Sequence, residues 1–203
     1  MNKIDFPIDK HAWHPSLIPG PIVLISTYNA QGEPNIAPKS LVQMVSINPP
    51  IMMFSGTQNN TTEKNILKTQ CFGVNFVHSS IASKVYDCVQ WFGQERIQKT
   101  GFTLINASKI SAPLVSECRA HLECILLDSK EVGRGFVIFG EIVKASIWDH
   151  ITKVDFAKRY ELFDQIIYLE SGFFCQISNL SKIEFSKEEY LANKNRTQSA
   201  IKE

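Results

Sequence analysis

The sequence predicts a mainly β protein, built as an antiparallel barrel with helical insertions. About eight or nine short segments are rich in β-branched and aromatic residues and are separated by turn residues, a pattern typical of all-β domains. Roughly two to four helical stretches interrupt them without regular alternation and without an internal repeat. This irregular order favours a barrel over a doubly wound parallel sheet.

Composition limits the class of protein. The chain has 203 residues, of which 44% are hydrophobic and 20% charged, which is ordinary for one globular domain. Its 21 basic and 20 acidic side chains give a net charge of +1, so charge offers no basis for binding nucleic acid or an anionic membrane. No apolar run is long enough to cross a bilayer, and the first residues lack the apolar core of a signal peptide. We therefore expect a cytoplasmic protein with no nucleic-acid or membrane partner.

Cysteine and histidine spacing predicts no metal site. The cysteines are odd in number, scattered and without CxxC spacing, so we expect reduced side chains, mostly in apolar segments. His11 and His14 have HxxH spacing, but no third ligand lies nearby in the sequence. They belong to a stretch without periodicity. We divide the chain into an N-terminal arm (residues 1–19), a barrel domain (20–186) and a polar C-terminal tail (187–203).

The first predicted hairpin begins after Gly20. A strand over residues 22–28 is followed by turn chemistry at 29–32, and a strand over 35–45 should return beside it. Pro34 and Pro38 cannot donate to a ladder, so this second strand is expected at a sheet edge or with a bulge near Pro38. A bulge can direct backbone groups toward a ligand.

The next stretch predicts a buried strand and a loop. The rigid turn Asn48-Pro49-Pro50 leads into an apolar strand over residues 51–54, expected to be buried on both faces, and a small-residue loop over 55–57 follows. Further strands are expected at residues 71–76, 120–127, 136–147, 166–169 and 172–177. One helix is expected to start at Ser80 and another to span residues 151–163. The loop-rich excursion over residues 90–112 is a plausible lid.

The helix predicted over residues 61–69 carries the strongest functional signal. Asn60 with Glu63 three residues later matches a capping arrangement. The N–H groups at a helix N-terminus are unpaired, and phosphate commonly binds to them. Two threonines and an asparagine in the first turns add polar groups, which predicts a phosphate-bearing cofactor. Because these residue types are favoured at helix starts in any protein, an ordinary capped helix is the alternative.

Several motifs in the range 21–176 carry a family resemblance. They are Gly32-x-x-Asn35-x-Ala37-Pro38-x-Ser40, Asn48-Pro49-Pro50, Thr61/Thr62-x-x-Asn65-Ile66, Phe72-x-Val74-Asn75, Gly101-Phe102-Thr103, Ala112-Pro113-Leu114-Val115-Ser116-Glu117 and Phe139-Gly140-Glu141-Ile142. In this order and spacing they resemble the flavin reductase-like family of FMN-binding split β-barrel proteins. The resemblance implies an antiparallel, Greek-key-like split barrel, FMN as cofactor, and a homodimer with the flavin near the subunit interface. It also implies NAD(P)H as a possible electron donor and free flavin or another small molecule as acceptor.

The resemblance also implies which residues hold the flavin. Those expected at its phosphate are Thr61, Thr62 and Asn65; those at the ring edge are Lys39, Ser40 and Leu41; and those beneath the ribityl chain are Ser55, Gly56 and Thr57. No side chain is assigned a catalytic role, because hydride would enter at flavin N5 and the protein would supply orientation.

One turn departs from the family pattern. Members that use nicotinamide commonly carry a Gly-Asp-His turn, whereas the corresponding turn here is Gly133-Arg134-Gly135. This leaves three hypotheses open. The chain is an FMN-dependent NAD(P)H oxidoreductase, an FMN-binding electron-transfer protein without NAD(P)H turnover, or a barrel that has lost its flavin.

Overall fold

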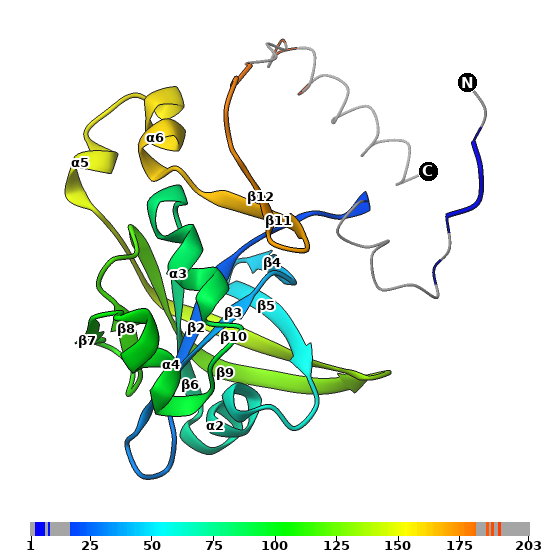
Figure 1. Ribbon diagram of the computed structural model, residues 1–203. Coiled ribbons are helices and arrows are strands. Elements are labelled where there is room, and N and C mark those ends of the chain that lie inside the picture. The colour runs from blue at the N-terminus through cyan, green and yellow to red at the C-terminus, as the bar shows by residue number, and fades with distance from the viewer. Residues whose placement is uncertain are drawn as a thin grey trace, which may run out of the picture.

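The computed structural model describes residues 3–6, 8, 17–181, 186, 188 and 191 (Figure 1). His11 and His14, with most of the predicted arm, and nearly all of the predicted tail over 187–203 lie outside these residues. The described chain is mainly β and antiparallel, as the sequence predicts, with helices inserted between strands.

One seven-stranded antiparallel sheet forms the barrel. In sheet order its strands are β3 (Pro34–Lys39), β2 (Val23–Tyr28), β6 (Cys71–Phe76), β9 (Ala120–Val132), β10 (Gly135–Ile147), β5 (Pro50–Thr57) and β4 (Val42–Ile47). The two edge strands, β3 and β4, follow each other in sequence and are joined by Ser40 and Leu41 alone. The sheet therefore curls until its two edges meet at these residues, a place we call the seam. There the Ser55 N–H donates to the Leu41 carbonyl at 2.9 Å.

Smaller elements surround this barrel. They are a sheet of β1 (Gly20–Pro21), β11 (Ile166–Glu170) and β12 (Phe173–Gln176), a pair of β7 (Leu104–Asn106) and β8 (Pro113–Val115), the 3₁₀ turn η1 (Ser79–Ile81), and the helices α2 (Thr61–Thr69), α3 (Ala82–Asp87), α4 (Gly93–Thr100), α5 (Asp149–Thr152) and α6 (Phe156–Phe163). In Figure 1, α2 lies at one end of the barrel, α3 and α4 lie along its side, and α5 and α6 lie at the other end.

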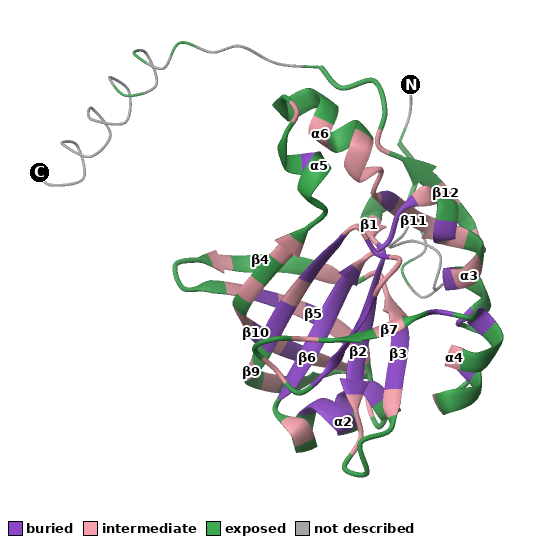
Figure 2. Cartoon of the chain, turned by 90° about the vertical axis from the view of Figure 1, so that its left-hand side faces the viewer, coloured by how far each residue is buried: buried purple, intermediate pink, exposed green. Residues whose placement is uncertain are grey.

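Strand β2 lies between two hydrophobic cores. Because side chains alternate along a strand, Val23 and Ile25 pack into a core inside the barrel, where Phe54 and Phe72 meet edge to face with ring centroids 5.4 Å apart. On the other face of β2, Leu24 packs into a second core beneath α3. Burial on both faces explains why β2 and β6 are almost entirely purple in Figure 2.

The predicted strand over residues 35–45 is wrong in its length. It is broken after Lys39 into β3 and β4, because the chain turns the barrel corner there instead of forming a bulge near Pro38. The Ser40 carbonyl packs so closely on Gly20 that a Cβ at residue 20 would lie 2.2 Å from its oxygen. The edge position expected from the prolines is confirmed.

The neighbouring predictions need two corrections. Strand β5 buries Met52 and Phe54, while Ile51 and Met53 are half-buried, so one face of this strand is not covered. Residues 55–57 do not form a loop but end β5, because residues 135–137 of β10 extend the ladder alongside them.

The predicted helices match the structure to different degrees. The predicted helix over residues 61–69 coincides with α2, yet the Asn60 side chain makes no capping bond and Glu63 turns inward. The helix expected from Ser80 begins as the turn η1, and the Ser80 hydroxyl bonds to His78. The excursion over 90–112 contains α4 and β7. The helix expected over 151–163 is broken into α5 and α6, because the Asp155 side chain caps a new start.

Candidate functional site

Two buried asparagines fix the start of α2 against the barrel. The Asn35 amide on β3 donates to Thr62 Oγ1 at 3.0 Å, and the Asn65 amide on α2 donates to Thr27 Oγ1 on β2, also at 3.0 Å. The accepted bond leaves the hydroxyl proton of Thr62 available for another acceptor. The helix N-terminus is therefore held with Thr61 and Thr62 facing the β3 edge.

A cavity of about 280 Å³, here called the helix hollow, lies between β3, the start of α2 and the α3–α4 segment. Its lining includes Asn35, Thr61, Thr62, Phe92 and Arg96. The unpaired N–H groups of the first turn of α2 lie at this end of the barrel, so the hollow favours an anion.

Arg96 gives the helix hollow a buried positive charge. Its side chain reaches from α4 to the barrel, where Nε donates to the Trp91 carbonyl at 2.8 Å and Nη1 donates to the Ile36 carbonyl. Arg96 is 8% exposed, and none of the ion pairs among the described residues includes it. Burial lowers the pKa of its guanidinium, which nevertheless stays charged. A buried charge without a counter-ion is costly, and an anion in the hollow would offset that cost.

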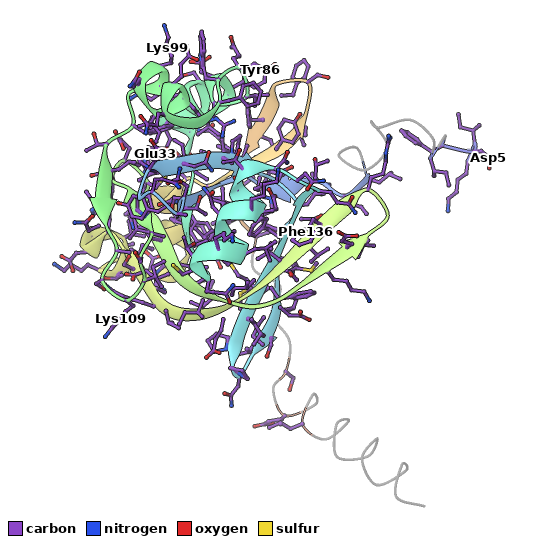
Figure 3. All side chains as sticks on the ribbon, turned by 90° about the horizontal axis from the view of Figure 1, so that it is seen from below. Asp5, Glu33, Tyr86, Lys99, Lys109 and Phe136 are labelled. Carbon is purple, nitrogen blue, oxygen red and sulfur yellow. The ribbon has the colours of Figure 1, made fainter. Side chains whose placement is uncertain are left out.

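A second cavity, of about 310 Å³, continues from the first along β3 and is here called the aromatic hollow. Both cavities are lined by Pro38, Lys39 and Val89, so they adjoin. The aromatic hollow is walled by Tyr86 of α3 together with the side chains of Tyr168 and Phe174 from the β11–β12 hairpin. In Figure 3, Tyr86 projects from the helical layer beside this hairpin. Each cavity is near the lower end of the size range of ligand sites, roughly 300 to 1,000 Å³.

Lys39 and Glu63 form a buried ion pair beside the two hollows. Lys39 Nζ lies 2.5 Å from Glu63 Oε1, and the side chains are 10% and 2% exposed. Among the described residues, Glu63 Oε2 has no hydrogen-bond partner. The pair is seated on Gly56, where a Cβ would lie 1.8 Å from Glu63 Oε1 and 2.4 Å from Lys39 Nζ. Glycine at residue 56 is thus what makes room for the pair.

The predicted flavin residues differ in their positions relative to the two hollows. Thr61 and Thr62 line the helix hollow, Ser40 lines the aromatic hollow, and Lys39 lines both. Five others line neither of these cavities: Leu41, Ser55, Gly56, Thr57 and Asn65. Leu41 is 51% exposed on the seam.

Sequence reasoning missed Arg96 as a site residue. It was one charged residue within the excursion over 90–112, and its contact with the Ile36 carbonyl spans 60 positions. No local pattern signals such a contact. Asn75, which belongs to one of the family motifs, satisfies backbone groups: its amide donates to the Leu24 carbonyl at 2.8 Å and its oxygen accepts from Val115 N–H at 2.7 Å.

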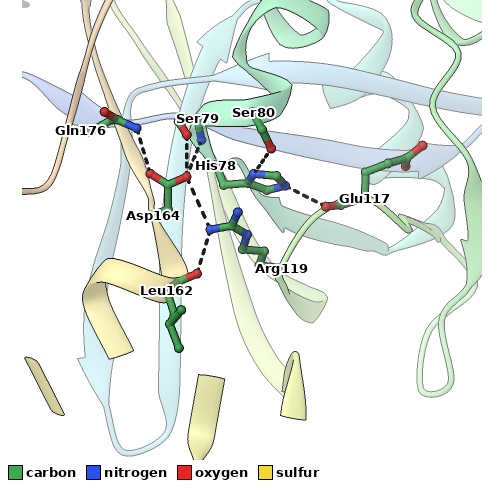
Figure 4. A network of polar contacts seen from close by, with 8 residues as sticks. All are labelled: His78, Ser79, Ser80, Glu117, Arg119, Leu162, Asp164 and Gln176. Carbon is green, nitrogen blue, oxygen red and sulfur yellow. Dashed lines mark hydrogen bonds and ion pairs between the residues drawn. The ribbon is translucent and has the colours of Figure 1, made fainter. Parts of the chain in front are cut away.

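A separate polar network, drawn in Figure 4, joins α6 and β12 to the barrel. Asp164 pairs with Arg119 at 3.4 Å and accepts a hydrogen bond from the Ser79 hydroxyl at 2.5 Å. His78 is held between the Glu117 carbonyl and the Ser80 hydroxyl, and burial lowers the pKa of its imidazole. Every group drawn has a protein partner, so we assign the network a structural role.

In the described part of the chain, no helix is long and apolar enough to cross a membrane. Likewise, the described residues contain no group of three or more His, Cys, Asp or Glu side chains placed to hold a metal ion.

The comparisons with known proteins identify the family and agree with the barrel fold. The model of the flavin reductase like domain matches residues 16–162, most of the chain. The chain belongs to the flavin reductase-like family. A relative in Aquifex aeolicus, an uncharacterized protein, is 32% identical over 157 residues, which are 74% of this chain and 80% of the relative.

Solved structures share the fold of this family member. The 2-nitrobenzoate 2-nitroreductase of Pseudomonas fluorescens superposes with a TM-score of 0.79 at 24% identity, covering 90% of this chain and 93% of the other. A protein of Shewanella frigidimarina, described as a flavin reductase with a split barrel domain, gives a TM-score of 0.78 at 22% identity, with 89% and 94% covered. The fold is therefore a split barrel of this family, as the resemblance implied.

The residues present fit a flavin mononucleotide. The helix hollow offers N–H groups, hydroxyls and a guanidinium that has no ion pair among the described residues, and these suit a phosphate. The aromatic hollow offers tyrosine and phenylalanine side chains, which suit a planar ring. Edge strand β3 runs along both hollows and presents backbone groups that the ladder does not use.

Proposed function

We propose that the protein binds FMN across the seam and passes electrons from NAD(P)H to free flavin or another small acceptor. The observation that carries this proposal is the buried Arg96 guanidinium, which has no carboxylate partner among the described ion pairs and lines the same cavity as the start of α2. A phosphate in the helix hollow would receive hydrogen bonds from the α2 backbone, from Thr61 and Thr62, and from Arg96.

The remainder of the cofactor would follow β3 toward the aromatic hollow. The residues from Asn35 to Ser40 span about 16 Å at the rise of a β-strand, and the two cavities follow this length of chain. Backbone groups around Ser40 and Leu41 would meet the polar edge of the ring, and Tyr86 would cover a ring face from α3.

Bound flavin supplies the redox chemistry by accepting and releasing a hydride or electrons at N5. The side chains of the site would bind, orient and shield it. The predicted cytoplasmic location stays a prediction.

A homodimer is part of the proposal. Strand β4 borders the seam and carries three exposed apolar side chains, Met44 at 47%, Val45 at 46% and Ile47 at 90% exposure. Exposed apolar side chains clustered on one strand favour burial against another surface. A second copy of this chain would cover them beside the flavin.

The first experiment compares FMN with riboflavin, which lacks the phosphate. Wild type should bind FMN more tightly than riboflavin. Arg96→Gln should lower the affinity for FMN by roughly 10 to 100-fold and leave the affinity for riboflavin nearly unchanged. Any structural damage would weaken the binding of both ligands, so the ratio of the two affinities isolates the phosphate contact. Lys99→Gln on the exposed side of α4, which Figure 3 shows pointing outward, is the matched control. Binding of neither ligand by wild type would overturn the proposal.

The second experiment tests the electron donor. NADH and then NADPH are added anaerobically to the FMN-loaded protein, and bleaching of the flavin absorbance is followed. Bleaching within seconds supports the oxidoreductase and identifies the donor. A flavin bleached by dithionite alone would favour the electron-transfer alternative, which the Gly133-Arg134-Gly135 turn keeps open.

A further inference from the structure

The buried pair of Lys39 and Glu63 calls for an explanation beyond helix capping. An acidic residue in the first turn of a helix usually faces solvent or the backbone N–H groups. Glu63 instead points inward and is 2% exposed, and its Oε2 has no partner in the part of the chain that the structure describes. Its one described ionic partner is Lys39, which lines both hollows.

Stability alone gives a weak reason for such a pair. Replacing a buried ion pair with apolar side chains of similar volume is often neutral or favourable for folding. A site that needed packing alone at this position could use apolar residues. The pair is also seated on a glycine that leaves it room, because a Cβ at residue 56 would overlap both charged ends.

We infer that Glu63 is a positioning residue that holds Lys39 at the flavin and balances its charge, so that the bound flavin has a lower reduction potential than Lys39 alone would give it. This inference rests on the proposed FMN site. Lys39 lies on the side of the hollows, and Glu63 lies behind it toward α2.

The sign follows from the charge of reduced flavin. Uptake of two electrons and one proton gives an anionic ring, which a nearby cation stabilises and a nearby carboxylate disfavours. A unit charge about 10 Å away, at an effective dielectric constant of about 20, is enough to change the equilibrium about tenfold. Lys39 without Glu63 therefore favours the reduced flavin, and the pair together is close to neutral.

The test is a redox titration of the FMN-loaded protein against a dye of known potential. Glu63→Gln should raise the flavin potential, shifting the ratio of reduced to oxidised flavin by about tenfold, which is about 30 mV for a two-electron couple. Lys39→Met should lower the potential. The double variant, Lys39→Met with Glu63→Gln, should return it close to the wild-type value.

The control removes a carboxylate from an exposed pair of the same type. Glu161→Gln on α6 breaks the pair with Lys158, in which the side chains are 57% and 53% exposed, and should leave the potential unchanged. If Glu63→Gln does not fold, Lys39→Met and the double variant still differ by the Glu63 charge alone, and the double variant must have the higher potential.

Two results would overturn the inference, and they are distinguishable. Variants that bind FMN with the wild-type potential would show that the pair is structural, leaving the proposed FMN site intact. Absence of bound flavin from wild type would overturn both the proposed function and this inference before any potential is measured.

Discussion

The Asn65 amide on α2 donates a 3.0 Å hydrogen bond to the Thr27 hydroxyl on β2, and both side chains are buried. The resemblance to the family implies that Asn65 also meets the cofactor phosphate, which stays a prediction. This hydrogen bond joins the helix to the sheet, and the parallel contact of Asn35 with Thr62 holds the helix start. The geometry of the helix hollow therefore depends on two side-chain amides that need not touch a ligand.

Asn65→Ala should lower the free energy of unfolding by about 1 to 3 kcal/mol, because Thr27 loses its buried donor. Urea denaturation checks this value. Lys64→Ala, an exposed position on the same helix, should change the free energy of unfolding by less than about 0.5 kcal/mol. Equal losses in the two variants would show that the hydrogen bond does not hold α2.

Gly56→Ala should reduce FMN affinity by at least about tenfold without unfolding the barrel. The new methyl group would overlap Glu63 Oε1 and Lys39 Nζ, both of which are ends of movable side chains, so the pair moves and the strand remains. Fluorescence titration gives the affinity, and circular dichroism reports the fold. Unchanged affinity would mean that the cofactor does not depend on the Lys39–Glu63 geometry.

Acidification should destabilise the protein through its buried histidines. Burial lowers the pKa of both His78 and His121 below the ordinary value of 6.5. As the pH falls through 6.5, these histidines bind protons in the unfolded chain but not yet in the folded chain. Their contribution to the free energy of unfolding is therefore fully present above this pH and is lost below it. Arg119 and Asp164 face His78 with opposite effects on its pKa.

Urea denaturation at about pH 7.5 and about pH 5.5 measures this loss. His78→Gln should show a smaller loss than wild type, since its amide still bonds but does not titrate in this range. A loss of the same size in both proteins would assign the pH dependence to other groups.

Ile47→Asp should weaken the proposed homodimer. The side chain is 90% exposed on β4, and a charge there would have to be desolvated when a second copy covers the strand. Light scattering after gel filtration gives the molar mass. Leu67→Asp on α2, where the leucine is 44% exposed, controls for a charge added elsewhere. A wild-type protein that stays a monomer at high concentration would contradict the proposal.

Local patterns predicted the fold well, whereas contacts distant in sequence were not predictable. The limits of α2 and β6 follow from residue spacing within each segment, and both predictions are confirmed. The break between β3 and β4 was missed because it is set by closure of the sheet, which brings Leu41 to Ser55. No glycine or proline stands at residues 40 and 41 to signal a corner.

The candidate site was predictable in its location but not in its charges. The helix-start residues and the β3 edge could be identified from polar residue types and prolines, and Thr61, Thr62, Lys39 and Ser40 do line the hollows. Arg96 was not identified, because periodicity within α4 cannot reveal that its side chain crosses to β3. The Lys39–Glu63 pair was hidden for the same reason, since a capping role explained Glu63 locally.

The two edges of the barrel sheet are protected unequally against strand addition. Strand β3 contains Pro34 and Pro38, which present no N–H group to an incoming chain, so that edge resists pairing. Strand β4 contains no proline over Val42–Ile47, and its exposed side chains are largely apolar. An intermolecular ladder, whether in an ordered assembly or in aggregation during refolding, is therefore directed to β4, and proline substitutions on this strand are the natural way to block it.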